Sequence, residues 1–165
     1  ECQMKFDDKH SFGKPAATVI KMFGDRSYFE RKYKEVGAWD IEVLDHEKTD
    51  KQFRIKVRYT MKSEAGLPDF AKKFIGDSSV ITQTDAWDLV KKTGRIEAEI
   101  KGAPVKVSAE MSLRDEGQGS ANLLKWTVSC GIPLLGGKLE KIISEDIQAK
   151  SRNDLAVSRK LLAGY

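Results

Sequence analysis

The stretch KLEKIISEDIQAKSRNDLAV, residues 138–157, decides the fold of this chain because it predicts one long amphipathic helix. Apolar residues recur on one face at helical spacing: Leu139, Ile142, Ile143, Val157 and Leu161. Three polar residues interrupt the same face: Asp146, Lys150 and Asn153. Asp146 precedes Lys150 by one helical turn, a spacing at which the two can form an ion pair. Two explanations stay open: the polar groups face a cavity, or the buried face slides sideways onto Ile147, Leu155 and Leu162.

The hydrophobic period changes to two over most of the preceding sequence, which is typical of half-buried strands. In QFRIKVRYTM, residues 52–61, every second residue is apolar. The patterns predict strands at 2–12, 39–47, 52–61, 79–91, 94–101, 104–114 and 121–131. They also predict short helices at 16–23 and 26–36, the second capped by Asp25, and a terminal helix of about 25 residues. Residues 1–165 are expected to form a single domain.

Each predicted strand has one apolar face and one polar face, so the strands should form an antiparallel sheet that is dry on one side only. Two short helices are too small to cover that dry side, and the terminal helix must complete the cover. The sequence therefore predicts an α+β fold in which a seven-stranded curved antiparallel sheet wraps around a long C-terminal helix. We expect a gap between the concave sheet and that helix.

The order of these elements spans essentially the whole chain and resembles the START-like, or helix-grip, superfamily (SRPBCC). SCGIPLLGGKLEKII at 129–143, with DRSYFERKY at 25–33 and TDAWDL at 84–89, is similar to a bacterial START-like family of unknown function. The resemblance implies a cavity for a hydrophobic ligand between sheet and helix. It implies no catalytic residues, because the superfamily shares no catalytic set and a fold alone does not assign an activity.

Polar residues also interrupt the apolar side of the first strand, where Asp8 and His10 lie. In a helix-grip sheet the first and last strands are antiparallel neighbours, which would place Asp8 near Lys150 and His10 near Asp154. The alternative is a strand that bends after Phe6 and exposes both residues. If they face inward, a polar patch orients the head group of an amphiphilic ligand, and its members are Asp8, His10, Asn122, Asp146, Lys150 and Asn153.

The rest of the expected cavity wall is apolar. Strand parity and the helix face give the candidate lining residues Phe53, Ile55, Val57, Tyr59, Met111, Trp126, Leu139 and Ile142. Trp87 shares inward parity, where a large aromatic side chain serves either the core or a ligand. Phe70 and Phe74 lie in LPDFAKKFIG, residues 67–76, which is either a lid over the cavity or a loop held by its own apolar residues.

Charge and composition narrow the class of partner. The chain has 29 Lys and Arg residues against 25 Asp and Glu residues, and both signs are mixed along the sequence. No basic recognition motif occurs, so a nucleic-acid partner is not expected. Two groups of basic residues are expected on solvated faces: Arg54, Lys56 and Arg58 of one strand, and Arg31, Lys32 and Lys34 of the second helix. Weak contact of these residues with an anionic membrane surface is a hypothesis. No run of about 18 apolar residues predicts a membrane span, and we expect a cytoplasmic protein, or a periplasmic one if the N-terminus is processed.

Neither a metal nor a cofactor is expected, because ligand spacings and glycine-rich phosphate loops do not occur in the sequence. Cys2 and Cys130 both lie on inward parity, and a cross-strand disulfide between them is an alternative to two free thiols. Residues 1–3 precede a natural start at Met4, so their origin stays open. The oligomeric state is not predicted.

These expectations favour a non-enzymatic carrier or sensor of a hydrophobic small molecule that is lipid-like, sterol-like or polyketide-like. A cyclase or hydrolase is one alternative, in which His10 with Asp8 or Asp146 moves a proton inside the same cavity. A protein-interaction module like the co-chaperone members of the superfamily is another, and a cavity too small for any ligand would favour it. No residue is assigned as catalytic.

Overall fold

The computed structural model describes residues 3–63 and 67–165 and has the predicted order of elements. The first half contains β1 (Gln3–Phe12), α1 (Ala16–Phe23), α2 (Arg26–Glu35), β2 (Trp39–Lys48), β3 (Gln52–Lys62) and α3 (Asp69–Lys72). The second half contains β4 (Ser78–Asp88), β5 (Thr93–Ile100), β6 (Val105–Glu116), β7 (Gly119–Cys130) and α4 (Gly136–Leu162). The predicted α+β fold is therefore confirmed.

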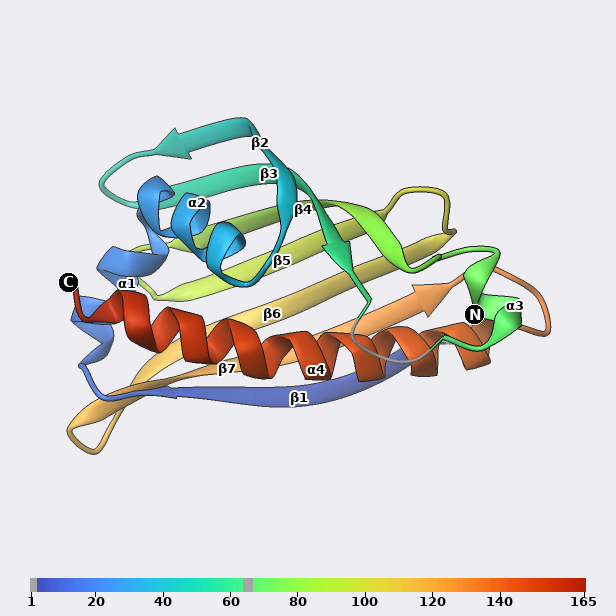
Figure 1. Cartoon of the computed structure of the whole chain (residues 1–165). Coiled ribbons are helices and arrows are strands. Elements are labelled where there is room, and N and C mark those ends of the chain that lie inside the picture. The colour runs from blue at the N-terminus through green and yellow to red at the C-terminus, as the bar shows by residue number, and fades with distance from the viewer. Residues whose placement is uncertain (1–2, 64–66) are drawn as a thin grey trace.

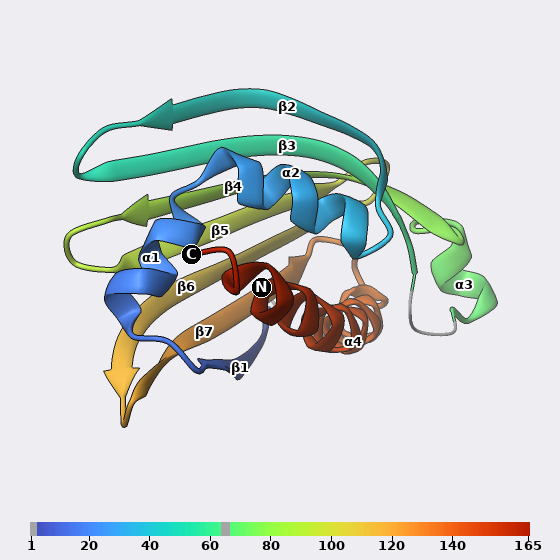
Figure 2. The ribbon, with the colours of Figure 1, turned by 60° about the vertical axis from the view of Figure 1, so that its left-hand side comes forward.

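All the strands belong to one antiparallel sheet with the order β1-β7-β6-β5-β4-β3-β2. The first and last strands are neighbours, and His10 of β1 lies opposite Asn122 of β7. Figure 1 shows α4 running along the inner side of the sheet, and Figure 2 shows the sheet curling over it with α2 beneath β3. The concave side of the sheet is thus shared between α4 and the α1–α2 pair.

The middle of the buried face of α4 is made of small polar side chains, not large apolar ones. Leu139 and Ile143 are buried near its start and Leu161 near its end. Between these ends the buried positions include Ser144, Ser151 and Ser158, which are spaced every seven residues. Small side chains allow a helix to approach its neighbours closely, and two of these serines contact β1 and α2 directly. The face predicted from the apolar residues is therefore real, but its centre is polar.

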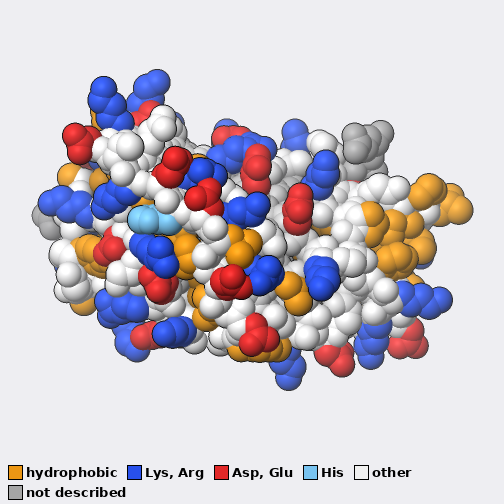
Figure 3. Space-filling view, turned by 90° about the horizontal axis from the view of Figure 1, so that it is seen from above, with side chains coloured by type: hydrophobic (Ala, Val, Ile, Leu, Met, Phe, Trp, Pro, Cys, Tyr) orange, Lys and Arg blue, Asp and Glu red, His pale blue; other side chains and the backbone are white. Residues whose placement is uncertain are grey.

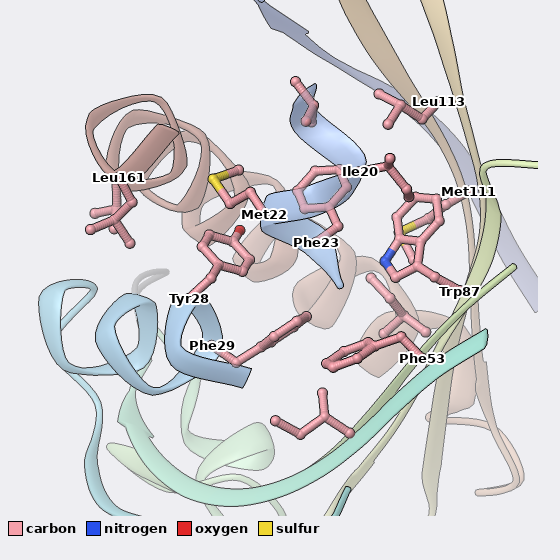
Figure 4. Packing of buried hydrophobic residues seen from close by; sticks show 14 of the residues in the cluster. Ile20, Met22, Phe23, Tyr28, Phe29, Phe53, Trp87, Met111, Leu113 and Leu161 are labelled. Carbon is pink, nitrogen blue, oxygen red and sulfur yellow. The ribbon is translucent and has the colours of Figure 1, made fainter. Parts of the chain in front are cut away.

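The helices α1 and α2 close one end of the interior. Asp25 caps α2 by accepting a hydrogen bond from the backbone N–H of Ser27, as the sequence predicts. The ring of Phe29 stacks on Phe53 at 5.6 Å between centroids, and the ring of Phe23 stacks on Trp87 at 5.1 Å. Figure 4 shows these rings packed against one another, so α1 and α2 cover this end of the sheet with aromatic side chains.

Candidate ligand-binding cavity

A cavity of about 180 Å³ lies between the sheet, α2 and α4. Its wall is largely apolar and rich in aromatic side chains, including Phe29, Tyr33, Tyr59, Trp87 and Trp126. Pockets for drug-sized ligands usually measure about 300–1,000 Å³, so this cavity suits a smaller molecule. The gap predicted between the sheet and the terminal helix is therefore present, but the packing of α1 and α2 makes it small.

The cavity wall includes about half of the residues predicted from the sequence to bind a ligand. These are His10, Tyr59, Trp87, Met111, Asn122, Trp126, Ile142, Asp146 and Lys150. Asp146 and Lys150 form the expected ion pair, with 2.7 Å between the Lys150 ammonium and the Asp146 carboxylate. Their side chains are 17% and 18% exposed, so the pair meets both the cavity and solvent. The explanation that the polar residues of this helix face a cavity is therefore correct for Asp146 and Lys150.

The other predicted residues lie elsewhere. Phe53, Ile55 and Val57 are buried on β3 but are absent from the cavity wall, and Phe29 of α2 stacks on Phe53. Leu139, Phe70 and Phe74 pack in a second core cluster near the start of α4. Asn153 is exposed, and its side-chain amide donates to the backbone oxygen of Val36 at 3.4 Å, which corrects its predicted inward orientation.

The segment around α3 contributes to the cavity through different residues from those expected. Leu67 and Ile75 line the cavity, whereas Phe70 and Phe74 do not. A hydrogen bond from the Ile75 N–H to the Ala71 oxygen, at 2.9 Å, helps to hold the segment. The segment therefore packs through its own apolar residues and also borders the cavity, and its role as a lid stays a prediction.

Asp8, His10 and Ser151 form a compact hydrogen-bonded group between β1 and α4. Ser151 Oγ donates to Asp8 Oδ2 at 2.6 Å, and His10 Nε2 lies 2.7 Å from Ser151 Oγ and 3.2 Å from Asp8 Oδ2. Because the serine hydroxyl already donates to Asp8, His10 Nε2 must donate to the serine oxygen. In a nucleophilic triad the histidine accepts the serine proton and the acid binds the opposite ring nitrogen. This group therefore has the geometry of a clasp between strand and helix.

The predicted level of Asp8 on the helix is correct to within a turn, since its partner Ser151 directly follows Lys150. Asp8 itself has a side chain that is 29% exposed and is absent from the cavity wall, whereas His10 is buried and lines it. Burial alone would raise the pKa of Asp8, but the hydrogen bond from Ser151 and the attraction of His10 outweigh burial and lower it. The predicted polar patch is thus divided, with His10, Asn122, Asp146 and Lys150 on the cavity side.

A second polar group, which the sequence reasoning missed, lies where α2 faces β4 and α4. Lys32 of α2 was expected on a solvated helix face, but it is buried and lies 3.0 Å from the Asp154 carboxylate. Tyr59 donates to Gln83 at 2.7 Å, and Gln83 donates to Asp85 at 2.8 Å. These five residues all line the cavity.

Burial and charge act against each other in this group. Burial raises the pKa of Asp85, and the attraction of Lys32 and the hydrogen bond from Gln83 offset only part of that effect. Burial alone would lower the pKa of Lys32, but the attraction of Asp154, joined by Tyr28 and Asp85, raises it overall. Lys32 is therefore held as an ammonium ion. The ionised form of Asp85 is destabilised, because burial removes the water that would solvate its charge.

Three cavity-lining side chains carry a buried polar atom without a hydrogen-bond partner among the described residues: Tyr33 Oη, Asn122 Oδ1 and Trp126 Nε1. Tyr33 and Asn122 are only 4% and 3% exposed. Buried polar atoms are nearly always satisfied in folded proteins, by protein, by water or by a ligand. All three side chains belong to the wall of the same cavity, which therefore combines an apolar surface with polar groups that lack a protein partner among the described residues.

Basic and acidic side chains are paired on the outer face of β2 and β3. Arg54 pairs with Asp45 and Glu47, and Arg58 pairs with Glu42, so two of the three β3 residues behind the membrane hypothesis are matched by acids. Figure 3 shows blue and red side chains mixed over this side, with hydrophobic side chains gathered at the end where α3 lies. No helix within the described residues is long and apolar enough to span a membrane.

Two further features concern possible metal ligands and the cysteines. In residues 3–63 and 67–165 no group of His, Cys, Asp and Glu side chains is arranged to hold a metal ion. Cys130 is buried at the end of β7, whereas Cys2 lies outside the described residues. Pairing of Cys2 with Cys130 therefore stays a prediction.

Known proteins share this fold at low sequence identity. Ara h 8.0201 is 15% identical with a TM-score of 0.69, over 99% of this chain and 100% of that one. The Zhui aromatase/cyclase from Streptomyces sp. R1128 is 12% identical with a TM-score of 0.68, over 98% and 94%. TTHA0849 from Thermus thermophilus is 16% identical with a TM-score of 0.66, over 99% and 98%. At such identities the likeness establishes the fold alone.

Sequence comparison gives a narrower result. None of the curated proteins matches the chain significantly. A family model described as "Protein of unknown function (DUF2505)" matches residues 7–162, from within β1 to the last residue of α4. Since that match covers the sheet, the cavity wall and the terminal helix together, the chain belongs to the DUF2505 family and has the helix-grip fold.

Proposed function

We propose that the protein binds a small, largely apolar molecule in the cavity between the sheet and α4, as a carrier or sensor. The observation that supports the proposal is the cavity itself, whose wall is rich in aromatic side chains and includes Tyr33 and Asn122, each with a buried polar atom that lacks a partner among the described residues. An apolar wall with a few convergent polar groups is the usual composition of a small-molecule site. Among proteins of this fold, the Zhui enzyme acts as an aromatase/cyclase, which is consistent with use of the interior for a small organic molecule.

The size of the cavity refines the ligand class expected from the sequence. A volume of about 180 Å³ is small for a sterol or a long acyl chain, so the molecule is the size of one ring system or a short chain. A larger ligand would require the segment bearing Leu67 and Ile75 to move away from α4. The clasp of Asp8, His10 and Ser151 opposes movement of α4 away from β1.

The direct test is native mass spectrometry of the purified protein, followed by organic extraction and mass analysis. A co-purified small molecule is expected, and it should be absent from the variant Ala98→Phe, because Ala98 lines the cavity on β5. Ala86→Phe is the matched control, since Ala86 lies outside the cavity wall on the adjacent strand β4. An empty wild-type protein, or equal occupancy in both variants, would contradict the proposal.

A further inference from the structure

His10 of the cavity wall is bonded to Ser151 and Asp8. Apart from His10, the wall carries one more acidic side chain than basic side chains, and the excess falls on Asp85. Three carboxylates and two ammonium groups line the cavity: Asp85, Asp146, Asp154, Lys32 and Lys150. Lys150 pairs with Asp146 at 2.7 Å, and Lys32 pairs with Asp154 at 3.0 Å. Within the part of the chain that the structure describes, Asp85 forms no ion pair.

Asp85 is also poorly hydrated. It is 5% exposed, it lies between Ile55 and Ile96 of the neighbouring strands, and it accepts one hydrogen bond, from Gln83. Lys32 attracts it only from beyond ion-pair distance. A buried carboxylate is costly unless a cation or several hydrogen bonds compensate for lost water. The side chain therefore favours an occupant that brings positive charge into the cavity.

The aromatic wall near this carboxyl group already accommodates one ammonium ion. The Lys32 nitrogen lies 5.4, 5.2 and 5.2 Å from the ring centroids of Tyr28, Phe29 and Tyr33. Aromatic faces at such distances attract cations. The Tyr33 hydroxyl oxygen is buried without a partner and can accept a hydrogen bond.

We propose that Asp85 recognises a small organic amine, bound as its ammonium ion with its apolar part against the aromatic wall. The inference rests on the proposed function, because this amine is the molecule that occupies the cavity. An ammonium group donates hydrogen bonds and accepts none, which matches the acceptors offered by Asp85 and Tyr33. A carboxylate ligand would add a second negative charge beside Asp85, and an alcohol would leave the charge of Asp85 uncompensated.

The test compares three probes that share one ring and differ in charge: benzylamine, benzyl alcohol and benzoate. Isothermal titration calorimetry on the wild-type protein is expected to show benzylamine binding at least about tenfold more tightly than benzyl alcohol, with benzoate weakest. Asp85→Asn keeps the shape and an acceptor for Gln83 but removes the charge, so the preference for benzylamine should disappear. Asp88→Asn makes the same charge change outside the cavity wall on the same strand and should retain the preference.

Other outcomes separate this inference from the proposed function. If benzyl alcohol or benzoate binds as tightly as benzylamine, or if Asp85→Asn keeps the preference, the amine is excluded while cavity binding stands. If none of the probes binds although an apolar molecule co-purifies, the amine inference alone fails. If none binds and nothing co-purifies, both fail. The wild-type comparison decides the matter even if a variant folds poorly.

Discussion

The ammonium group of Lys32 lies 3.0 Å from the carboxylate of Asp154, and this ion pair joins α2 to α4 across the interior. The side chain of Lys32 is 8% exposed, whereas that of Asp154 is 33% exposed and keeps part of its hydration. Lys32 therefore depends on the pair more than Asp154 does. Because α2 also covers β3 through Phe29 and Phe53, the pair helps to fix the helix that closes one side of the cavity.

Removing only one partner of this pair should destabilise the protein. Asp154→Leu leaves the buried Lys32 ammonium without its ion pair, and the loss in the free energy of unfolding is expected to be about 3 kcal/mol, measured by urea denaturation. The double variant Lys32→Met with Asp154→Leu should recover most of that loss, because it leaves no unpaired charge. Equal losses in the single and double variants would mean that the packing of the two side chains, not their charge, stabilises the contact.

Asp85 gives a prediction for pH dependence. Burial raises its pKa above the ordinary 3.8, so the folded state holds the proton more tightly than the unfolded state does. The stabilising contribution of the protonated group is complete below pH 3.8 and is lost as the pH rises through the folded-state pKa. Asp85→Asn cannot lose a proton. Its free energy of unfolding relative to wild type should therefore increase as the pH rises from about 4 toward neutrality, as measured by urea denaturation.

Asp88→Asn serves as the opposite control on the same strand. Hydrogen bonds from the backbone of Lys91 and Val90 lower the pKa of Asp88 despite some burial cost. Its contribution is present above pH 3.8 and is lost as the pH falls through the folded-state pKa. The stability of Asp88→Asn relative to wild type should therefore decrease with rising pH. The same slope in both variants would show that Asp85 is not the group responsible.

The fold is predictable from the sequence because its two periodicities are local and unambiguous. Strands such as β3 alternate strictly, and the face of α4 begins and ends with large apolar residues. The volume of the cavity, in contrast, does not follow from local sequence patterns. It depends on how the helices pack on the sheet. Phe29 of α2 stacks on Phe53, and Phe53, Ile55 and Val57 are buried on β3 outside the cavity wall.

The missed polar group had a signal in the sequence. Gln83 and Asp85 share the parity of Ile81 and Trp87 on β4, just as Asp8 and His10 share the apolar parity of β1. On α2 the buried residues Tyr28, Phe29, Lys32 and Tyr33 follow one helical stripe, so helical spacing places Lys32 inside it. Periodicity therefore indicates that Lys32 and Asp85 are buried, although the same reasoning wrongly places Asn153 inward. It does not pair Lys32 with Asp154, because that contact depends on the docking of two helices.

The clasp between β1 and α4 predicts a measurable role for Ser151. Ser151→Ala removes the hydroxyl that donates to Asp8, so the pKa of Asp8 should rise, as followed by NMR titration of its carboxyl carbon. A lowered pKa stabilises the folded state above pH 3.8 and the benefit is lost as the pH falls through the folded-state pKa. The variant should lose about 1 kcal/mol near neutral pH and less in acid. An unchanged Asp8 titration would show that the hydrogen bond does not form in solution.

Gly94 predicts how the cavity wall responds to one added methyl group. It lies opposite Trp87, and a Cβ atom there would stand 2.7 Å from Trp87 Cδ2 and 2.8 Å from the Ala86 oxygen. Replacing a strand glycine with alanine usually gains about 0.5–1 kcal/mol of backbone entropy, but overpacking costs about 1–3 kcal/mol. The backbone oxygen cannot move away as a flexible side chain can. The cost of overpacking should therefore exceed the gain in backbone entropy.

Gly94→Ala is therefore expected to lower the free energy of unfolding by about 1–2 kcal/mol and to change the near-UV circular dichroism of the Trp87–Phe23 stack. Gly13→Ala is the matched control, because a Cβ atom at Gly13 meets no other atom within 4 Å. That variant should leave both the stability and the spectrum close to those of the wild type. Since Trp87 also lines the cavity, ligand binding should weaken in Gly94→Ala and not in Gly13→Ala. Normal stability and an unchanged spectrum in Gly94→Ala would contradict this prediction. They would mean that the space between Gly94 and Trp87 is wide enough for a methyl group.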